Sequence, residues 1–336
     1  MDLSTTYLGL ALRNPLVVSA GPLTSSVDGV RRLADAGIGA VVLPSLFEEQ
    51  LQIRSDRDSQ LVMGGADSHA EAHSYLTGSV LDAWPHEYLR LIEKSAKLAG
   101  VPVIASLNGV SPGGWTSYAT AMQESGAAAI ELNVYYLPDD PLIPARAAEH
   151  RYAEILRSVK TAVRIPIAVK IAPYFSSPGE MALVLDYAGA DGLVLFNRFM
   201  QTDIDPETFT VSAGFRLSSP GEAALPRAWI SLLRGRVRCS LAASTGVETA
   251  GDVAAYLLAG ADVVMTTSAL LRHGPGYVTE LLDGLTTWME RKGFAAVTGV
   301  RGLLSGQAGF PPPGRAGYLS AIDQATHAFG ARAADM

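Results

Sequence analysis

Two apolar runs in the second half of the sequence end in residues that suit anion binding. The run Ser240–Thr245 is followed by Gly246, and the run Asp262–Ser268 leads into a helix-forming stretch. Small residues at such strand ends leave backbone N–H groups open to a ligand, and a helix N-terminus adds positive potential. The pattern predicts a phosphate site shared by two neighbouring strand ends, formed by Thr245, Gly246, Thr267 and Ser268.

Polar side chains also follow three earlier apolar runs. Asn133 ends one run, Lys170 lies within the next, and Asn197 with Arg198 ends a third. A lysine in an apolar strand costs free energy unless it is paired or serves a ligand. Lys170 is therefore either a ligand-binding cation or one half of an ion pair with Glu131. An asparagine at a strand end often only caps a helix, but three such groups on consecutive strand ends favour a common site.

The elements that must position these residues repeat along the chain. Several times a helix-like stretch ends in Ala-Gly-Ala-Asp or a similar sequence, and an unbroken apolar run follows, as in 188–197 and 259–268. Unbroken apolar runs are typical of parallel strands covered on both faces. Eight strands are predicted, at Leu16–Pro22, Ala40–Phe47, Val103–Asn108, Ala128–Tyr135, Ile167–Pro173, Gly192–Phe199, Ser240–Thr245 and Asp262–Ser268. Eight βα units favour a closed single-domain (β/α)₈ barrel, a TIM barrel, over an open sheet, and its site is expected at the C-terminal ends of the strands.

The predicted barrel domain covers residues 1–309 and carries two long connections, 48–84 and 200–226. Both leave strand C-termini, so we expect them to form lids or substrate walls. Residues 310–336 begin with a proline-rich break and form a C-terminal tail with a short helix at Leu319–Phe329. That tail packs on the barrel or reaches a neighbouring subunit of a homodimer, and the sequence leaves the two alternatives open.

Composition excludes several classes of protein. Charged residues make up 18% of the 336 residues, hydrophobic residues 48%, and the net charge of −7 comes without a basic run, which argues against nucleic-acid binding. The single cysteine, Cys239, excludes an internal disulfide and cysteine clusters, and a buried structural role is expected for it. His69 and His73 are spaced as a helical metal pair, but no further ligand completes a site, so no metal is expected. The chain shows neither a signal peptide nor an apolar run long enough to span a membrane, which predicts a cytoplasmic protein.

Taken together, the predicted strands and the polar residues at their ends resemble those of the dihydroorotate dehydrogenases, particularly the soluble class 1 branch. The matching segments keep the order and spacing of the family over residues 5–305; they are 14–21, 131–133, 169–175, Asn197, 205–207, 245–249 and 268–275. The resemblance implies FMN as the cofactor, a small-molecule substrate, and an electron acceptor that the sequence does not identify.

The resemblance also implies the roles of individual residues. Ala20 and Gly21 would lie under the flavin ring, with Ser45 and Ser106 beside it. Asn133 and Asn197 would face both ring and substrate. Lys170 would donate to the N1/C2=O region, where positive charge stabilises the reduced anion. Thr245, Gly246, Thr267 and Ser268 would take the phosphate through backbone N–H groups, although the family has glycine at the position of Thr245.

The loop that follows Asn133 departs from the family. Tyr136 stands where the family has a cysteine or serine base, and Pro138 stands where it has a substrate-binding asparagine. A phenol, with an ordinary pKa of about 10, is a poor base unless it is activated. Tyr136, Tyr135 or His73 are the candidates for proton transfer, His73 also for substrate binding. Arg198 is expected to meet either an anionic substrate or a carboxylate from the long second connection.

Three functions are compatible with this pattern. The first is an FMN oxidoreductase of this type that oxidises a CH–CH bond of a small anionic substrate other than dihydroorotate. The second is a genuine dihydroorotate dehydrogenase of pyrimidine biosynthesis. The third is a non-catalytic, flavin-holding barrel that serves as a partner subunit.

Overall fold

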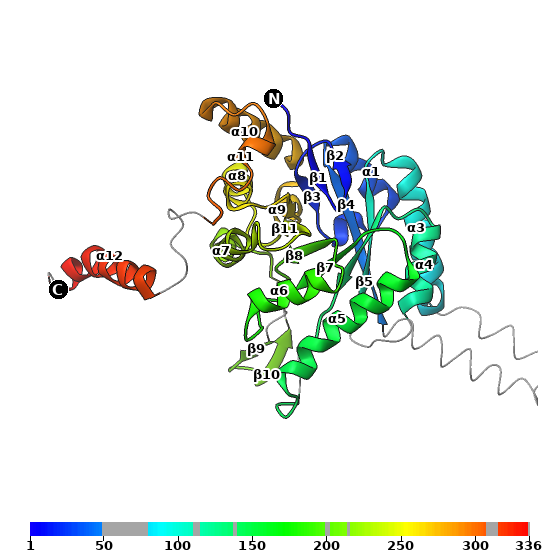
Figure 1. Cartoon of the computed structure of the whole chain (residues 1–336), viewed down its shortest axis with the longest axis horizontal. Coiled ribbons are helices and arrows are strands. Elements are labelled where there is room, and N and C mark those ends of the chain that lie inside the picture. The colour runs from blue at the N-terminus through cyan, green and yellow to red at the C-terminus, as the bar shows by residue number, and fades with distance from the viewer. Residues whose placement is uncertain are drawn as a thin grey trace, which may run out of the picture.

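The computed structural model describes residues 1–48, 80–109, 115–136, 140–198, 202–213, 216–306 and 315–334. Its centre is a closed barrel of eight parallel strands with helices around it (Figure 1). The strands are β3 (Leu16–Val18), β4 (Ala40–Phe47), β5 (Val103–Asn108), β6 (Ala129–Asn133), β7 (Ile167–Ile171), β8 (Gly192–Leu195), β11 (Ser240–Ala243) and β12 (Val263–Thr266). They follow one another around the barrel in chain order, and β12 pairs with β3 to close it. The predicted (β/α)₈ barrel is confirmed.

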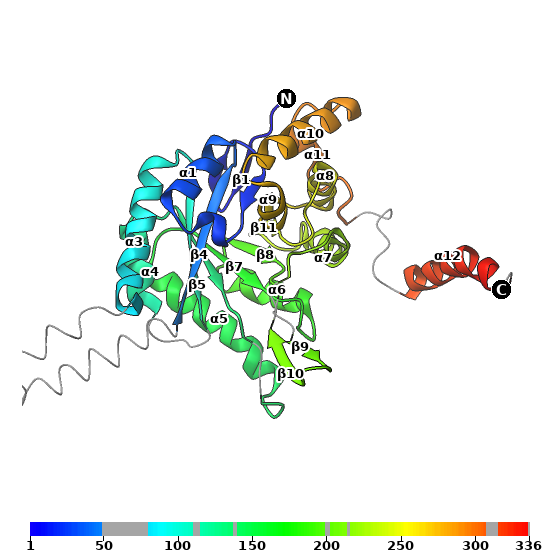
Figure 2. The ribbon, with the colours of Figure 1, turned by 180° about the vertical axis from the view of Figure 1, so that it is seen from behind.

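Helices connect the strands and form the outer layer, seen from the opposite side in Figure 2. They are α1 (Val27–Asp35), α3 (Val80–Leu98), α4 (Trp115–Glu124), α5 (Ala145–Ala162), α6 (Pro178–Tyr187), α7 (Ala224–Leu233), α8 (Ala250–Ala259), α9 (Ser268–His273), α10 (Tyr277–Lys292) and α11 (Val297–Val300). Each strand is therefore buried on both faces, which explains why the sequence shows unbroken apolar runs rather than alternation.

The core has two layers. An outer cluster lies between strands and helices, and an inner cluster of smaller side chains such as Ala40, Val42 and Ala168 fills the barrel. A hairpin of β1 (Thr5–Tyr7) and β2 (Leu10–Leu12) contributes Tyr7 and Leu8 to the inner cluster. Strands of three residues leave too short a pattern to be recognised, so this hairpin was not predicted.

Asp262, just before β12, ties the last two barrel strands together. Its carboxylate accepts a hydrogen bond from the backbone N–H of Leu241 at 2.8 Å. Ion pairs with Arg234 and Arg301 at 3.0 and 2.9 Å neutralise it. A buried carboxylate is stable only with such partners, and here they set the relative position of β11 and β12, whose opposite ends carry the predicted phosphate site.

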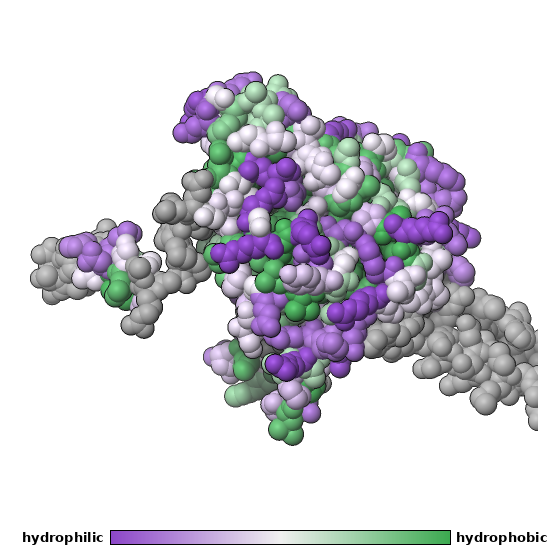
Figure 3. Space-filling model, viewed as in Figure 1, coloured by the Kyte–Doolittle hydropathy of each residue, from purple (hydrophilic) through white to green (hydrophobic). Residues whose placement is uncertain are grey.

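The second long connection forms a hairpin of β9 (Thr202–Asp205) and β10 (Thr210–Ala213), and the 3₁₀ helix η3 (Pro220–Ala223) follows it. Another 3₁₀ helix, η1 (Pro22–Thr24), follows β3. The hairpin exposes Ile204, Phe209 and Val211, and its region is partly green at the lower end of Figure 3. Most of the first connection, including His69 and His73, lies outside the described residues.

The tail forms α12 (Arg315–Ala334), which stands apart from the barrel in Figures 1 and 2. It extends beyond the short helix predicted at Leu319–Phe329 on both sides. Alanine is the best helix former, and alanines at 316, 331, 333 and 334 explain the extension. Within the described part of the chain, no helix is both long and apolar enough to cross a membrane.

Candidate active site

The C-terminal ends of the barrel strands bring the predicted polar residues to one face. Asn133 on β6 lies beside Lys170 on β7 in the strand register. Asn197 follows β8, and its backbone N–H donates to the carbonyl of Ile171 at 2.7 Å. Because parallel strands of a barrel all end at the same side, these residues meet although 64 positions separate Asn133 from Asn197.

The two asparagines are in direct contact. The Asn197 side-chain amide donates to Oδ1 of Asn133 at 2.6 Å, and both side chains are only partly buried. This bond leaves the Asn133 amide N–H₂ and the Asn197 carbonyl oxygen to face a ligand. The pair therefore offers both a donor and an acceptor at the mouth of the barrel.

Lys170 is the cation of the site, and Glu131 is its partner. The Lys170 Nζ lies 3.8 Å from Oε1 of Glu131, which is an ion pair but is too long for a hydrogen bond. The Lys170 side chain is 9% exposed and that of Glu131 is 1% exposed. Of the two explanations of Lys170, the structure shows the ion pair with Glu131, and ligand binding by Lys170 stays a prediction.

Ser45 and Ser106 lie side by side on β4 and β5. Their hydroxyl oxygens are 2.8 Å apart, so one donates to the other. Ser106 is fully buried and Ser45 partly buried. In the strand register Ser106 lies opposite Glu131, two residues before Asn133.

The ends of β3 and β12 approach each other closely. A Cβ placed on Gly21 would lie 3.0 Å from Cγ2 of Thr267, so the space there suits glycine. The Thr267 hydroxyl donates to the carbonyl of Ser19 at 3.0 Å. Ala20, between Ser19 and Gly21, packs against the inner core cluster. Ala20 and Gly21 therefore place two small residues just after β3.

The end of β11 keeps the backbone of a glycine turn although it carries a threonine. Thr245 has a φ of +81° and Gly246 a φ of +70°. A β-branched residue in this region is strained, and two hydrogen bonds hold Thr245 there. Its hydroxyl donates to the Phe196 carbonyl at 3.2 Å, and the Tyr256 hydroxyl donates to its carbonyl at 2.6 Å.

Ser218, which was not predicted, connects the two strand ends of the expected phosphate site. Its hydroxyl accepts from the Gly246 backbone N–H at 3.2 Å. Its own backbone N–H and its hydroxyl both donate to the Ser268 hydroxyl at 3.0 Å. The Gly246 N–H and both donors of Ser218 are therefore engaged within the protein, so the Ser218 segment lies on the strand end where the phosphate was expected. The only signal in the sequence is that Ser218 belongs to the serine-rich connection leaving the same face.

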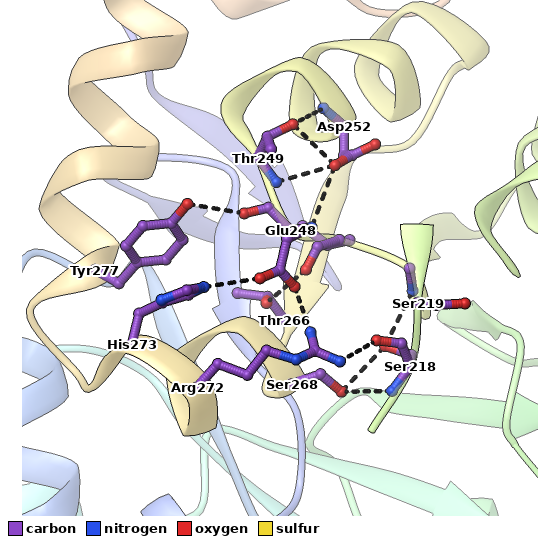
Figure 4. A network of polar contacts seen from close by, with 12 residues as sticks. Ser218, Ser219, Glu248, Thr249, Asp252, Thr266, Ser268, Arg272, His273 and Tyr277 are labelled. Atoms are coloured by element: carbon purple, nitrogen blue, oxygen red, sulfur yellow. Dashed lines mark hydrogen bonds and ion pairs between the residues drawn. The ribbon is translucent and has the colours of Figure 1, made fainter. Parts of the chain in front are cut away.

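Arg272 fixes this segment in place (Figure 4). Its guanidinium donates to the Ser218 carbonyl at 2.6 Å and pairs with Glu248. Glu248 also contacts Nε2 of His273 at 2.8 Å, and its carbonyl accepts from the Tyr277 hydroxyl at 3.1 Å. The network connects the segment at Ser218 to the ends of both β11 and β12.

Two further predicted site residues, Tyr136 and Arg198, contact α5 and the second long connection, respectively. The ring of Tyr136 packs on the outer core, with the Arg151 guanidinium 4.2 Å from its centroid, so α5 holds it on one side. Arg198 donates to Oε1 of Glu222 at 2.9 Å and to the Arg216 carbonyl. Of the two alternatives for Arg198, the structure shows the carboxylate from the second connection.

The described residues contain no cluster of metal-ligating side chains and no activated thiol. No group of three metal-ligating side chains occurs in the described ranges. Burial raises the pKa of the Cys239 thiol, and the nearby Asp186 acts in the same direction. A nucleophilic cysteine has a lowered pKa, so the thiol fits its expected structural role.

The closed barrel carries Lys170, the Asn133–Asn197 pair and the turn at Gly246 at the C-terminal ends of its strands, the end where barrel enzymes have their active sites. The family model for dihydroorotate dehydrogenase matches residues 75–289. A relative from Methanothermobacter thermautotrophicus, named dihydroorotate dehydrogenase B (NAD(+)), catalytic subunit, is 28% identical over 315 residues, covering 90% of this chain and 98% of the relative. A relative of the same name from Methanocella arvoryzae is 27% identical over 304 residues, 87% of this chain and 94% of its own length.

The chain belongs to the dihydroorotate dehydrogenase family. It is a flavin-dependent oxidoreductase of the type that acts on a CH–CH bond.

Gly246 offers a test of the turn at the end of β11. A Cβ there would lie 2.7 Å from the Ala223 backbone nitrogen and 2.9 Å from the Ser219 carbonyl oxygen. Gly246→Ala is therefore expected to lower the free energy of unfolding by about 1–3 kcal/mol more than Gly189→Ala, through overpacking. Gly189 is the matched control because its φ is +99° and nothing lies within 4 Å of its Cβ position.

Urea denaturation of the two variants measures the difference. Gly246→Ala is also expected to weaken cofactor retention, because Ser219 and Ala223 must move away from the strand end. Equal stability of the two variants would show that the segment at Ser218 does not press on this turn.

Proposed function

We propose that the chain binds FMN across the barrel mouth and oxidises a CH–CH bond of a small anionic substrate. The observation that supports this most is the position of Lys170: a buried cation with one distant acidic partner, beside Asn133 and at the level where the strands end. A buried cation costs free energy unless a ligand or partner compensates it. A flavin edge that becomes negative on reduction is such a ligand.

The residues around Lys170 suit the same cofactor. Ala20 and Gly21 supply a floor without side-chain bulk, and Ser45 with Ser106 supplies hydroxyl groups at the edge. A phosphate would bind at Gly246, Ser218 and Ser268 by replacing the hydrogen bonds that these residues make with one another, with Thr245 and Thr267 shaping the two strand ends. When bound, FMN supplies the hydride acceptor at N5. Lys170 would donate to the N1/C2=O edge, and Asn133 with Asn197 would orient the substrate.

We further propose that the substrate is not dihydroorotate. Tyr136 replaces the thiol or hydroxyl base, and Pro138 removes an amide that a planar polar substrate would need. Loss of a hydrogen-bonding group from a site that recognises polar atoms weakens binding of the original substrate strongly. Arg198 is engaged with Glu222, so Asn133, Asn197 and a phenol of Tyr135 or Tyr136 would contact the substrate. We place the protein in the cytoplasm and leave its electron acceptor and any homodimer to experiment.

Dihydroorotate itself is the second candidate. The relatives named dihydroorotate dehydrogenase B (NAD(+)), catalytic subunit, align over nearly their whole length, which favours it.

The visible absorption spectrum of the purified protein tests the proposal. We expect a flavin spectrum that dithionite bleaches under anaerobic conditions and that dihydroorotate leaves unchanged. Bleaching by dihydroorotate would select the second candidate. Protein that is colourless and takes up no added FMN would contradict both.

A further inference from the structure

Glu131 is a buried acid that the proposed chemistry does not use. It lies on β6 between Ser106 of β5 and Ala168 of β7 in the strand register, two residues before Asn133. Its side chain is 1% exposed, and neither carboxyl oxygen has a hydrogen-bond partner among the described residues. An ionised carboxylate without hydrogen bonds in the protein interior costs free energy. The presence of Glu131 directly below the barrel mouth therefore needs an explanation.

Three titratable groups from three elements act on Glu131. Lys170 of β7 is the nearest, at 3.8 Å. Tyr7 of β1 acts from the hairpin side, and its buried hydroxyl also has no hydrogen-bond partner in the described part of the chain. Tyr88 of α3 is buried, and its hydroxyl accepts from the Ser106 backbone N–H at 2.9 Å. Lys170 is the only cation of the three, so the charge of Glu131 depends on Lys170.

Burial raises the pKa of Glu131, and the nearby Lys170 opposes that rise. The two effects leave the carboxyl sensitive to whatever else Lys170 neutralises. As long as no anion lies on the side of Lys170 that faces away from Glu131, the positive charge of Lys170 acts fully on Glu131 and favours its ionised carboxylate. If an anion forms on that far side, it competes for the same ammonium, and the low dielectric of the interior makes the competition strong.

We propose that Glu131 is a proton-accepting counterion of Lys170, and that its carboxylate takes up one proton from solvent when a negative charge forms on a flavin bound at the mouth. The proposal rests on the proposed function, because it requires FMN beside Lys170. Dithionite supplies two electrons and is oxidised in water to bisulfite, with release of two protons (S₂O₄²⁻ + 2 H₂O → 2 HSO₃⁻ + 2 H⁺ + 2 e⁻). The flavin takes the two electrons and one proton from solvent and becomes an anion. Glu131 binds a second proton, so the protein with its flavin takes up two protons per two electrons, separately from those that dithionite releases.

The test measures the flavin reduction potential against pH in the FMN-loaded wild type and in Glu131→Gln, by equilibration with dyes of known potential. One extra proton per two electrons adds a tenfold change in the equilibrium constant per pH unit, about 30 mV. We expect this steeper segment in the wild type and its absence in Glu131→Gln. At pH values above the steeper segment, the wild-type reduction potential should be lower than that of Glu131→Gln, because the ionised carboxylate opposes electron uptake. At pH values below the segment, the reduction potentials of the two proteins should converge.

Glu93→Gln is the matched control. It makes the same change in an exposed glutamate that pairs with Lys97 at 2.7 Å on α3, and it should keep the wild-type curve. Wild type and Glu131→Gln are also titrated side by side with dithionite and a pH indicator, so that the protons released by dithionite cancel in the difference. The wild type should take up to one more proton per flavin than the variant within the steep segment.

Parallel curves for wild type and Glu131→Gln, or the same proton balance in both proteins at every pH, would overturn the inference while FMN binding stands. Protein that binds no FMN would instead overturn the proposed function and this inference with it.

Discussion

Replacing Lys170 by methionine is expected to lower the reduction potential of the bound flavin by roughly 30–60 mV. Methionine keeps most of the side-chain volume and removes the charge. A hydrogen bond from a charged group contributes about 1.5–3 kcal/mol, and about 1.4 kcal/mol corresponds to about 30 mV for a two-electron couple. The reduced anion loses this stabilisation and the neutral oxidised ring does not, so reduction becomes harder.

The same variant should also retain less FMN after gel filtration, because one donor to the ring is gone. Lys160→Met is the control: Lys160 pairs with Asp191, and the two side chains are 36% and 35% exposed, outside the residues that form the mouth. Unchanged FMN content and potential in Lys170→Met would exclude Lys170 from contact with the flavin, and its ion pair with Glu131 would then be its whole role.

Replacing Tyr136 by phenylalanine is expected to slow reduction of the flavin by its organic substrate by about 10²- to 10⁴-fold, the usual contribution of a general acid or base. The change removes one oxygen and keeps the ring that packs beneath Arg151 on α5. Flavin content and dithionite reduction should therefore stay at wild-type levels. Stopped-flow absorbance under anaerobic conditions measures the rate with dihydroorotate or with the substrate that titration identifies.

Tyr135→Phe is the matched control for this prediction. The two phenols are neighbours, and Tyr136 packs in the outer core while Tyr135 does not belong to it. If Tyr136→Phe reacts at the parent rate and Tyr135→Phe is slow, the proton-transfer group is Tyr135. Parent rates in both would remove the phenols from the reaction altogether.

The barrel could be predicted from the amino-acid sequence. Eight unbroken apolar runs, each buried on both faces, specify parallel strands, and eight repeated units specify closure. The sequence also predicted which strand ends carry polar groups, because strand C-termini of a parallel barrel must meet on one face. Asn133, Lys170 and Asn197 could therefore be placed together without any knowledge of their contacts.

The pairing of these groups became visible only in the folded protein. The path of the 200–226 connection cannot be deduced from local patterns, and it determines that Ser218 joins Gly246 to Ser268 and that Glu222 engages Arg198. The hydrogen bonds that hold Thr245 at a positive φ come from positions 11 and 49 residues away. The isolation of Glu131 likewise depends on side chains from β1, β5, β7 and α3. Strand positions follow from burial along one segment, whereas hydrogen-bond partners and local charge depend on several segments that only the folded chain brings together.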